Sequence, residues 1–405
     1  MRIVILIFGS YGDHAPMWLV GQEAVRRGHQ VVAIGNARFF AMHDWSAMQT
    51  VDIVTLEESK AGEEKIAENS VLGNFGLFKT WVETNLRRSY DALKQLAPFD
   101  DTILFIPNGP GALSALTIRE QHAVPVMHYH LDPWSTLDTS RDWSERFRNW
   151  TIKKIIGSTV QKMFDEFRRQ EGLPRIPNYA AWEDLQVDAA CGMYAEFTAK
   201  ARPFKAPPYP FYMTGFSMTS MPPEPVPPHI ETFLASGPPP VVVSKPSWLA
   251  KNDRYFRETE LALERLNMRG ILTGSAGEST VTILRVPFAN HRDFLQRGSA
   301  FIHHGGAGTA GAGLYAGVPQ IVVPQAPMQR DFGHRLKNLG VGAIIDPWAY
   351  RAARVAKVLE KLTTSPTVAA RCLELAEELH RPGQTSCELV CDAIEVLAKR
   401  GCRFR

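Results

Sequence analysis

Short apolar runs and helical patterns alternate from the first residues of the chain. Residues 3–8 are continuously apolar, which is typical of a strand buried on both faces of a parallel sheet. Residues 17–27 have a helical pattern that ends at Gly28, and residues 29–34 predict a second strand. A strand, a helix and a strand in this order predict a βαβ unit.

The same alternation continues along the chain and is interrupted once. Prolines crowd residues 203–240, where they exclude a helix or a central strand and predict a stiff linker. We therefore expect two α/β domains, one on each side of this linker. The further strands expected are residues 102–106, 124–127, 241–243, 270–273, 300–302 and 320–323, and the further helices are residues 112–121, 255–267, 351–361, 367–379 and 385–400.

The length of the chain agrees with two domains, and its charge excludes nucleic acid as a partner. A chain of 405 residues can form two domains with a core each. The net charge of +3 is too small to indicate a nucleic-acid-binding protein. No apolar run approaches the roughly 20 residues of a transmembrane helix. We therefore expect a cytoplasmic protein, with at most a peripheral contact to a membrane.

The five cysteines predict free thiols in a reducing compartment, because their number is odd and they are widely scattered. Cys387 and Cys391 would lie on one face of a helix. A metal pair there would need further ligands at a suitable spacing, so we expect small core residues and no metal site.

A glycine-rich stretch near residue 305 is the strongest candidate for a binding site. It follows the short apolar run 300–302 and precedes a helix that starts near Thr309. Glycines let the backbone approach a ligand closely, and the free N–H groups of a helix start favour an anion such as a pyrophosphate. The alternative is a tight turn between strand and helix that binds no ligand. The stretch reads His303, His304, Gly305, Gly306, Ala307, Gly308 and Thr309.

This stretch, with Ala-Gly-Val-Pro-Gln at 316–320, resembles the nucleotide-binding signature of the family-1 glycosyltransferases. Residues 212–216 and 308–314 look like the versions in sterol glucosyltransferases and rhamnolipid-type rhamnosyltransferases. The resemblance implies the GT-B fold, in which two Rossmann-like domains face each other across a cleft. The domains expected are 1–215 for the acceptor, 216–240 as linker, 241–384 for the nucleotide sugar, and 385–405 as a helix returning to the first domain.

A second match lies in residues 9–16, where the family carries Gly-Ser-x-Gly-Asp-x-x-Pro. By this resemblance Asp13 is the general base that takes the proton from the acceptor hydroxyl. His14 is the second candidate for the base. From the residue type alone, Asp13 is an Asx turn or a helix N-cap instead.

The acceptor cleft is expected at the carboxyl ends of the first strands. Its candidate residues alternate as strand residues do, and they are polar cleft groups or, alternatively, metal ligands. Residues 141–169 form an amphipathic basic helix, which is either a lid that touches lipid or an ordinary packed helix. The candidate cleft residues are Ser10, His128, His130, Asp132 and Trp134.

On the donor side, the resemblance places Ser247 at the diphosphate and Phe288 on the nucleotide base. Three positions depart from the family, namely Pro246, Ala312 and Met328, of which Met328 replaces the aspartate of the Asp-Gln pair that holds the sugar hydroxyls. Either the donor is a deoxysugar, or Asp331 replaces the lost carboxylate, or the site is impaired. The retained member of the pair is Gln329.

Together with these residues, the resemblance implies an inverting, metal-independent transfer of a hexosyl group from a UDP- or dTDP-sugar to a hydrophobic acceptor. The nucleotide sugar is a co-substrate, and no cofactor is expected. The main alternative is a non-catalytic nucleotide-sugar-binding or partner protein. An epimerase of the same shape would need paired carboxylates and a further base in the cleft, which the sequence does not offer.

Overall fold

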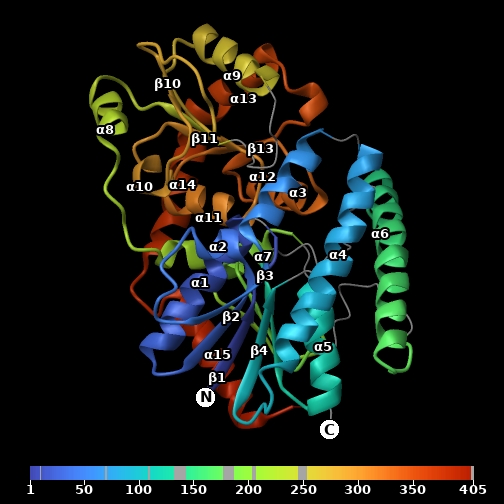
Figure 1. Cartoon of the computed structure of the whole chain (residues 1–405). Coiled ribbons are helices and arrows are strands. Elements are labelled where there is room, and N and C mark those ends of the chain that lie inside the picture. Colours follow the sequence, from blue (N-terminus) through green and yellow to red (C-terminus); the bar gives the residue numbers. More distant parts are fainter. Residues whose placement is uncertain are drawn as a thin grey trace. The chain divides into compact units, whose positions relative to one another are not determined.

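The computed structural model describes residues 1–402 except residues 10, 69–70, 108–109, 132–142, 177–186, 203–206 and 245–252. The chain divides into two compact units (Figure 1). The first unit comprises residues 1–193, 204–217 and 384–405, and the second comprises residues 194–203 and 218–383. Each unit is built on one parallel sheet covered by helices, which confirms the predicted α/β class.

The first sheet has seven strands in the order β3-β2-β1-β4-β5-β6-β7. Ile3 of β1 lies opposite Val31 of β2 on one side and opposite Ile103 of β4 on the other. The order reverses between β1 and β4, and such a reversal is where ligands bind at the carboxyl ends of parallel strands. The strands are β1 (Arg2–Leu6), β2 (Gln30–Asn36), β3 (Gln49–Val54), β4 (Thr102–Pro107), β5 (Val126–His130), β6 (Ala189–Gly192) and β7 (Phe211–Met213).

The second sheet has six strands in the order β10-β9-β8-β11-β12-β13. Here the order reverses between β8 and β11, so the turn that follows β11 lies where a ligand is expected. The strands are β8 (Val241–Ser244), β9 (Gly270–Thr273), β10 (Ile283–Val286), β11 (Ala300–His303), β12 (Gln320–Val322) and β13 (Gly342–Ile344).

The helices cover both faces of each sheet. In the first unit they are α1 (Tyr11–Arg26), α2 (Ala37–Phe40), α3 (Leu56–Glu68), α4 (Val71–Lys94), α5 (Pro110–His122), α6 (Trp143–Gln170) and α15 (Ser386–Arg400). In the second unit they are α7 (Glu196–Lys200), α8 (Pro228–Ala235), α9 (Asp253–Arg265), α10 (Arg292–Leu295), α11 (Ala307–Tyr315), α12 (Pro327–Asn338), α13 (Ala352–Thr363) and α14 (Pro366–His380).

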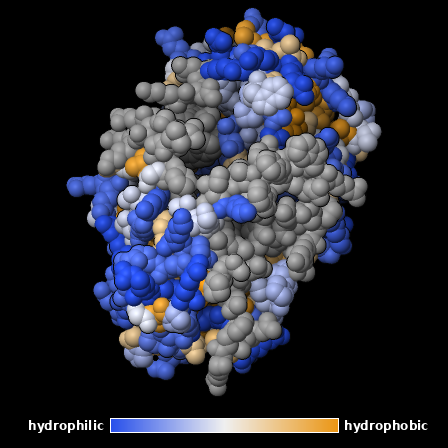
Figure 2. Space-filling view, turned by 90° about the vertical axis from the view of Figure 1, so that its right-hand side faces the viewer, coloured by the Kyte–Doolittle hydropathy of each residue, from blue (hydrophilic) through white to orange (hydrophobic). Residues whose placement is uncertain are grey.

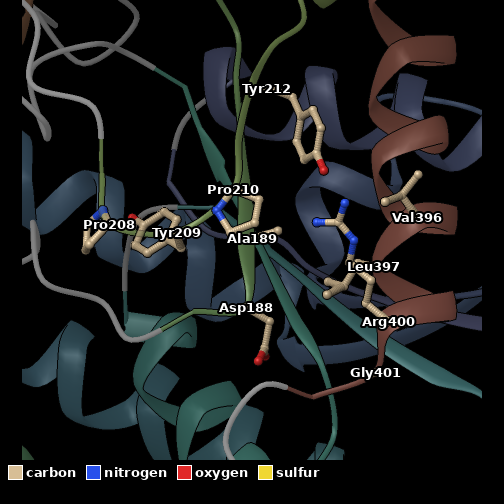
Figure 3. A pocket seen from close by; sticks show the side chains of 10 residues that line it. All are labelled: Asp188, Ala189, Pro208, Tyr209, Pro210, Tyr212, Val396, Leu397, Arg400 and Gly401. Atoms are coloured by element: carbon tan, nitrogen blue, oxygen red, sulfur yellow. The ribbon is translucent and has the colours of Figure 1, made fainter.

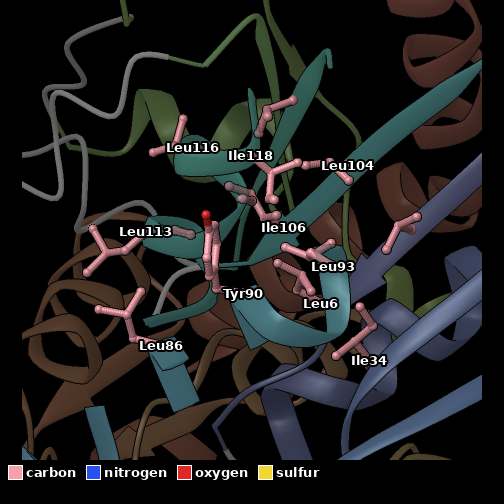
Figure 4. Packing of buried hydrophobic residues seen from close by; sticks show 14 of the residues in the cluster. Leu6, Ile34, Leu86, Tyr90, Leu93, Leu104, Ile106, Leu113, Leu116 and Ile118 are labelled. Atoms are coloured by element: carbon pink, nitrogen blue, oxygen red, sulfur yellow. The ribbon is translucent and has the colours of Figure 1, made fainter. Parts of the chain in front are cut away.

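The core of the first unit explains the apolar runs of the sequence. Leu6 and Leu104 from adjacent strands are fully buried, as is Leu93 of α4, and Figure 4 shows them packed with their neighbours. Burial of a side chain of this size contributes about 1.5–3 kcal/mol. The apolar runs therefore hold β1 and β4 in place, and with them the loop that follows β1.

Three predicted boundaries differ from the structure. Helix α1 starts at Tyr11 and not at residue 17, so Asp13 lies in its first turn. The proline-rich stretch 216–240 is not free of helix, because α8 begins at Pro228, whose fixed φ and missing N–H suit a first helical position. Met328 and Gln329, for which no helix was predicted, lie in the first turn of α12, again with a proline at its start.

The predicted division of the chain also differs in one segment. Residues 194–203, which we expected in the first domain, belong to the second unit. They lie in sequence between β6 and β7, two adjacent strands of the first sheet. Helix α15 belongs to the first unit and starts with a capping box formed by Thr385 and Glu388.

The surface drawn in Figure 2 is mainly hydrophilic in its described part, and its hydrophobic residues form separate areas. Within the described ranges, no helix is both long and apolar enough to cross a membrane.

Candidate functional site

The glycine-rich turn of the second unit is shaped by a tight contact with α12. Gly305 follows β11 with a φ of +92°, a conformation that side chains disfavour. A Cβ on this residue would lie 2.6 Å from the carbonyl oxygen of Gln329 and 2.7 Å from Cγ1 of Val322. Position 305 therefore needs glycine, and the turn is pressed against the residue of α12 that was predicted to bind the sugar.

His303 has a different role from the predicted donor contact. It is fully buried, its Nδ1 accepts a hydrogen bond from the N–H of Gly305 at 3.0 Å, and its Nε2 lies 2.8 Å from Oε1 of Gln320. Since Nδ1 accepts, Nε2 carries the proton and donates to Gln320. Burial lowers the pKa of His303 to about 3, which keeps the ring neutral. His303 thus positions the turn, and we correct the prediction that it contacts the donor.

Of the two histidines in the turn, His304 is the one whose ring can contact a ligand. Its side chain is partly exposed, and its Nδ1 has no hydrogen-bond partner among the described residues. The ring lies over Gly306, where a Cβ would be 2.8 Å from Nε2. Burial lowers the pKa of His304 to about 4, so the free protein presents a neutral ring at pH 7.

Helix α11 starts directly at this turn and offers backbone donors. Gly306 is the N-cap residue, and no side chain caps the helix. The first N–H groups of a helix have no partner within it and carry the positive end of its dipole. A neutral imidazole beside such donors can bind an anion without any added charge.

The first turn of α12 contributes Met328 and Gln329. Gln329 is nearly buried, and its Oε1 accepts a hydrogen bond from the N–H of Gln325 at 2.7 Å. Its side-chain amide nitrogen remains as a donor. Met328 is partly exposed and can offer only a weak thioether acceptor.

Asp331 cannot replace the missing carboxylate of the sugar site. Its exposed fraction is 2%, and its two oxygens bind Nη1 of Arg202 at 2.5 Å and Nε of Arg335 at 2.7 Å. Arg335 also donates to the carbonyl oxygens of Thr198 and Ala199. The carboxylate is therefore held inside an ion network that fixes α12 against the segment 194–203. Its predicted contact with a donor sugar is corrected.

Of the other predicted donor residues, the structure describes Phe288 but not Ser247. Phe288 follows β10 and is 74% exposed, so its ring is accessible for stacking. Ala289 packs in one core cluster with Ala312 of α11, which brings this segment to the same part of the unit. Ser247 lies outside the described residues, as does Pro246.

Asp13 of the first unit lies in the first turn of α1, which follows β1 at the point where the strand order reverses. Gly9 has a φ of +99°, and any Cβ there would collide with the carboxylate of Asp13. The carboxylate is therefore folded back over the loop, and it is partly exposed. This placement suits a base that a hydroxyl must reach.

His14 does not suit the second-candidate role of base. It is fully buried, and its ring stacks on Phe39 with centroids 4.3 Å apart. Burial, helped by the charges of His43 and Arg38, lowers the pKa of His14 to about 3. A buried ring of such low basicity is a poor proton acceptor at neutral pH.

The two predicted acceptor-cleft residues that the structure describes are not accessible. His128 and His130 are buried, with exposed fractions of 0% and 1%, and their ring centroids are 4.1 Å apart. Because their side chains lie in the core, the prediction that they line a cleft is corrected. The described residues contain no group of three or more potential metal ligands. Ser10, Asp132 and Trp134 lie outside the described residues.

Arg202 and Gln320, which complete the two networks, were not selected from the sequence. Gln320 was only part of a motif, yet its side chain occupies space that a Cβ on Gly313 would fill. Arg202 lies far from Asp331 in sequence, so no spacing pattern could connect them. The pair Asp331 and Arg335 could have been found, because residues four apart face each other on a helix.

Comparison with known proteins gives matches over almost the whole chain. The family described as erythromycin biosynthesis protein CIII-like, C-terminal domain, matches residues 275–396. An O-mycaminosyltylonolide 6-deoxyallosyltransferase of Streptomyces fradiae is 26% identical, over 96% of this chain and 97% of its own length. A sterol 3-beta-glucosyltransferase of Pichia angusta is 23% identical, over 91% of this chain but only 31% of its own length.

Two solved structures share the arrangement of elements. The glycotransferase of kitacinnamycin has a TM-score of 0.74 at 18% identity, with 98% of both chains covered. The calicheamicin glycosyltransferase CalG4 has a TM-score of 0.69 at 16% identity, again with 98% of both chains covered. At this identity the likeness establishes the fold, and it confirms the GT-B architecture expected from the sequence.

Proposed function

We propose that this glycosyltransferase of the family-1 type transfers a hexosyl group from a UDP- or dTDP-sugar to a hydroxyl of a hydrophobic acceptor. The observation that carries the proposal is the start of α11, where uncapped N–H groups follow a glycine turn and Nε2 of His304 lies over Gly306. Backbone donors at a helix start suit a diphosphate, which is the leaving group of such a donor.

Transfer needs stabilisation of the diphosphate as it leaves. In the proposed reaction, the bond between the anomeric carbon and the phosphate oxygen breaks, and the N–H groups of residues 306–309 receive the developing charge. Fixed donors of this kind are worth several kcal/mol of barrier when they are held rigidly. His303, through Gln320 and Gly305, supplies that rigidity.

The acceptor hydroxyl must lose its proton as it attacks. We assign this proton to Asp13, whose partly exposed carboxylate lies at the carboxyl end of β1. The new glycosidic bond forms on the face opposite the leaving group, so single displacement inverts the anomeric carbon. The reaction as proposed uses no metal ion and no cofactor.

The donor sugar is proposed to be a deoxyhexose. Met328 cannot accept a strong hydrogen bond, and Asp331 is bound by two arginines, so a fully hydroxylated sugar would lack a carboxylate partner there. The name of the Streptomyces relative, a 6-deoxyallosyltransferase, supports a deoxysugar donor.

The test compares Asp13→Asn with wild type in two assays, nucleotide binding and sugar transfer. The variant keeps the shape of the side chain but removes the base, so transfer should fall about 10²–10⁴-fold while stabilisation by UDP or dTDP is unchanged. His14→Gln serves as the neighbouring control and should affect stability more than the transfer rate. Nucleotide binding without transfer to any acceptor would favour the alternative, a non-catalytic nucleotide-sugar-binding protein.

A further inference from the structure

A cavity of about 370 Å³ lies in the first unit, where the end of α15 meets the last two strands of the sheet (Figure 3). Its volume falls within the range of small-molecule sites. The lining residues come from two segments far apart in sequence, and they are Asp188, Ala189, Pro208, Tyr209, Pro210, Tyr212, Val396, Leu397, Arg400 and Gly401.

The cavity is separate from the predicted acceptor residues. Ala189 is the first residue of β6, and Pro210 immediately precedes β7, so the cavity opens at the amino ends of these strands. Asp13 follows the carboxyl end of β1, at the opposite edge of the same parallel sheet. The proposed transfer reaction therefore gives this cavity no role.

Its walls are mainly apolar, and the lining residues include an arginine, Arg400. Tyr209 and its two flanking prolines form one wall, and Val396 and Leu397 of α15 contribute to another. The guanidinium group of Arg400 points into the cavity beside the hydroxyl of Tyr212 (Figure 3). Among the ion pairs of the described ranges, none involves Arg400.

The carboxylate in the cavity lining, that of Asp188, would not repel a bound anion. Asp188 is buried, its oxygens accept hydrogen bonds from Arg119 at 2.9 and 3.3 Å, and its Oδ2 also accepts one from the N–H of Val126. Its charge is thus compensated within the fold. Lys399 precedes Arg400, and two more arginines follow in the sequence at 403 and 405, so this end of the chain is basic.

We propose that this cavity is a second binding site, which takes a small carboxylate with an aromatic or short alkyl body. The body would contact the proline and tyrosine wall, and the carboxylate would accept hydrogen bonds from Arg400 and Tyr212. A guanidinium group binds a carboxylate through two parallel hydrogen bonds, which gives it a preference over a neutral group of the same shape.

Ligand-observed NMR titration of the full chain tests the proposal with three probes, namely benzoate, its neutral isostere benzamide, and inorganic phosphate. Benzoate should bind saturably, and the other two should bind about tenfold more weakly or not at all. Arg400→Gln should weaken benzoate about tenfold, whereas Arg400→Lys should retain part of the affinity. Lys399→Gln is the matched control, since it removes an exposed cation of the same helix turn that does not line the cavity.

Competition with UDP separates this site from the donor site. Benzoate bound at the cavity should not be displaced by saturating UDP. The proposal is overturned if UDP displaces benzoate, if Lys399→Gln and Arg400→Gln weaken it equally, or if benzoate and benzamide bind alike. None of these outcomes depends on whether the protein transfers a sugar.

Discussion

Replacing Asp331 by asparagine should destabilise the second unit strongly. The change removes the charge that compensates Arg335, whose side chain is fully buried, and also releases Arg202. Breaking a buried ion pair by removing one partner typically costs 3–5 kcal/mol, because a buried charge is left uncompensated. This is a large part of the roughly 5–15 kcal/mol by which native proteins are stable.

The same helix offers a matched control. Arg330 of α12 pairs with Asp346, whose side chain is 30% exposed, so solvent screens this pair. Asp346→Asn should therefore cost only about 0–1 kcal/mol. Comparing the two variants separates the effect of burial from the general loss of a carboxylate.

Urea unfolding at pH 7 measures both variants. Because the proposed nucleotide site lies in the second unit, the transition expected to shift on addition of UDP is assigned to that unit. Asp331→Asn should lower the free energy of unfolding of this transition by several times more than Asp346→Asn. Equal losses in the two variants would refute the conclusion that the ion network fixes α12.

Three further predictions concern the donor site and pH. His304→Ala should weaken the binding of UDP or dTDP by about ten- to a hundredfold, which is the loss expected for one hydrogen bond to a charged group. Calorimetry measures this affinity, and an unchanged value would remove His304 from the phosphate site. Met328→Asp should shift the ratio of specificity constants toward UDP-glucose by roughly tenfold, and an unchanged ratio would show that Met328 does not contact the sugar. Burial lowers the pKa values of His14 and His303 to about 3, so between pH 6.5 and 4 the unfolded chain takes up protons that the native protein does not. Stability should therefore fall as pH falls through this window, by up to about 1.4 kcal/mol per pH unit for each such histidine, and a flat profile in urea unfolding would contradict their burial.

The apolar runs predicted β1, β2, β4, β5, β8, β9, β11 and β12, because a strand buried on both faces leaves a continuous signal in the sequence. Strands β3, β6, β7, β10 and β13 were not predicted. Strand β13 left no such signal, since its three residues are only partly buried. Helix α12 was not predicted, and two prolines, Pro324 and Pro327, lie near its start, where proline commonly interrupts a helix. In the structure one of them, Pro327, occupies the first turn, where proline is tolerated.

The glycine turn was predicted at the right place in the chain, but the surroundings of the nearby polar residues were not predicted. The glycine turn after β11 is where the sequence placed it, because glycine at a positive φ leaves a visible pattern. The roles of His303, Asp331 and His128 depend on what surrounds each side chain, and burial of a polar residue has no signature in a single sequence. One of the partners, Arg202, lies far from Asp331 along the chain.

The path of the chain between the two units has a practical consequence for making hybrids of related enzymes. The chain passes from one unit to the other four times, so no single junction divides the gene into two halves that match the two units. A hybrid joined near residue 218 would pair α12 of one parent with residues 194–203 of the other. Arg202 and the carbonyl oxygens that hold Arg335 would then be inherited separately from Asp331. A second unit exchanged between relatives should therefore carry this ten-residue segment with it, although it is encoded between two strands of the other sheet.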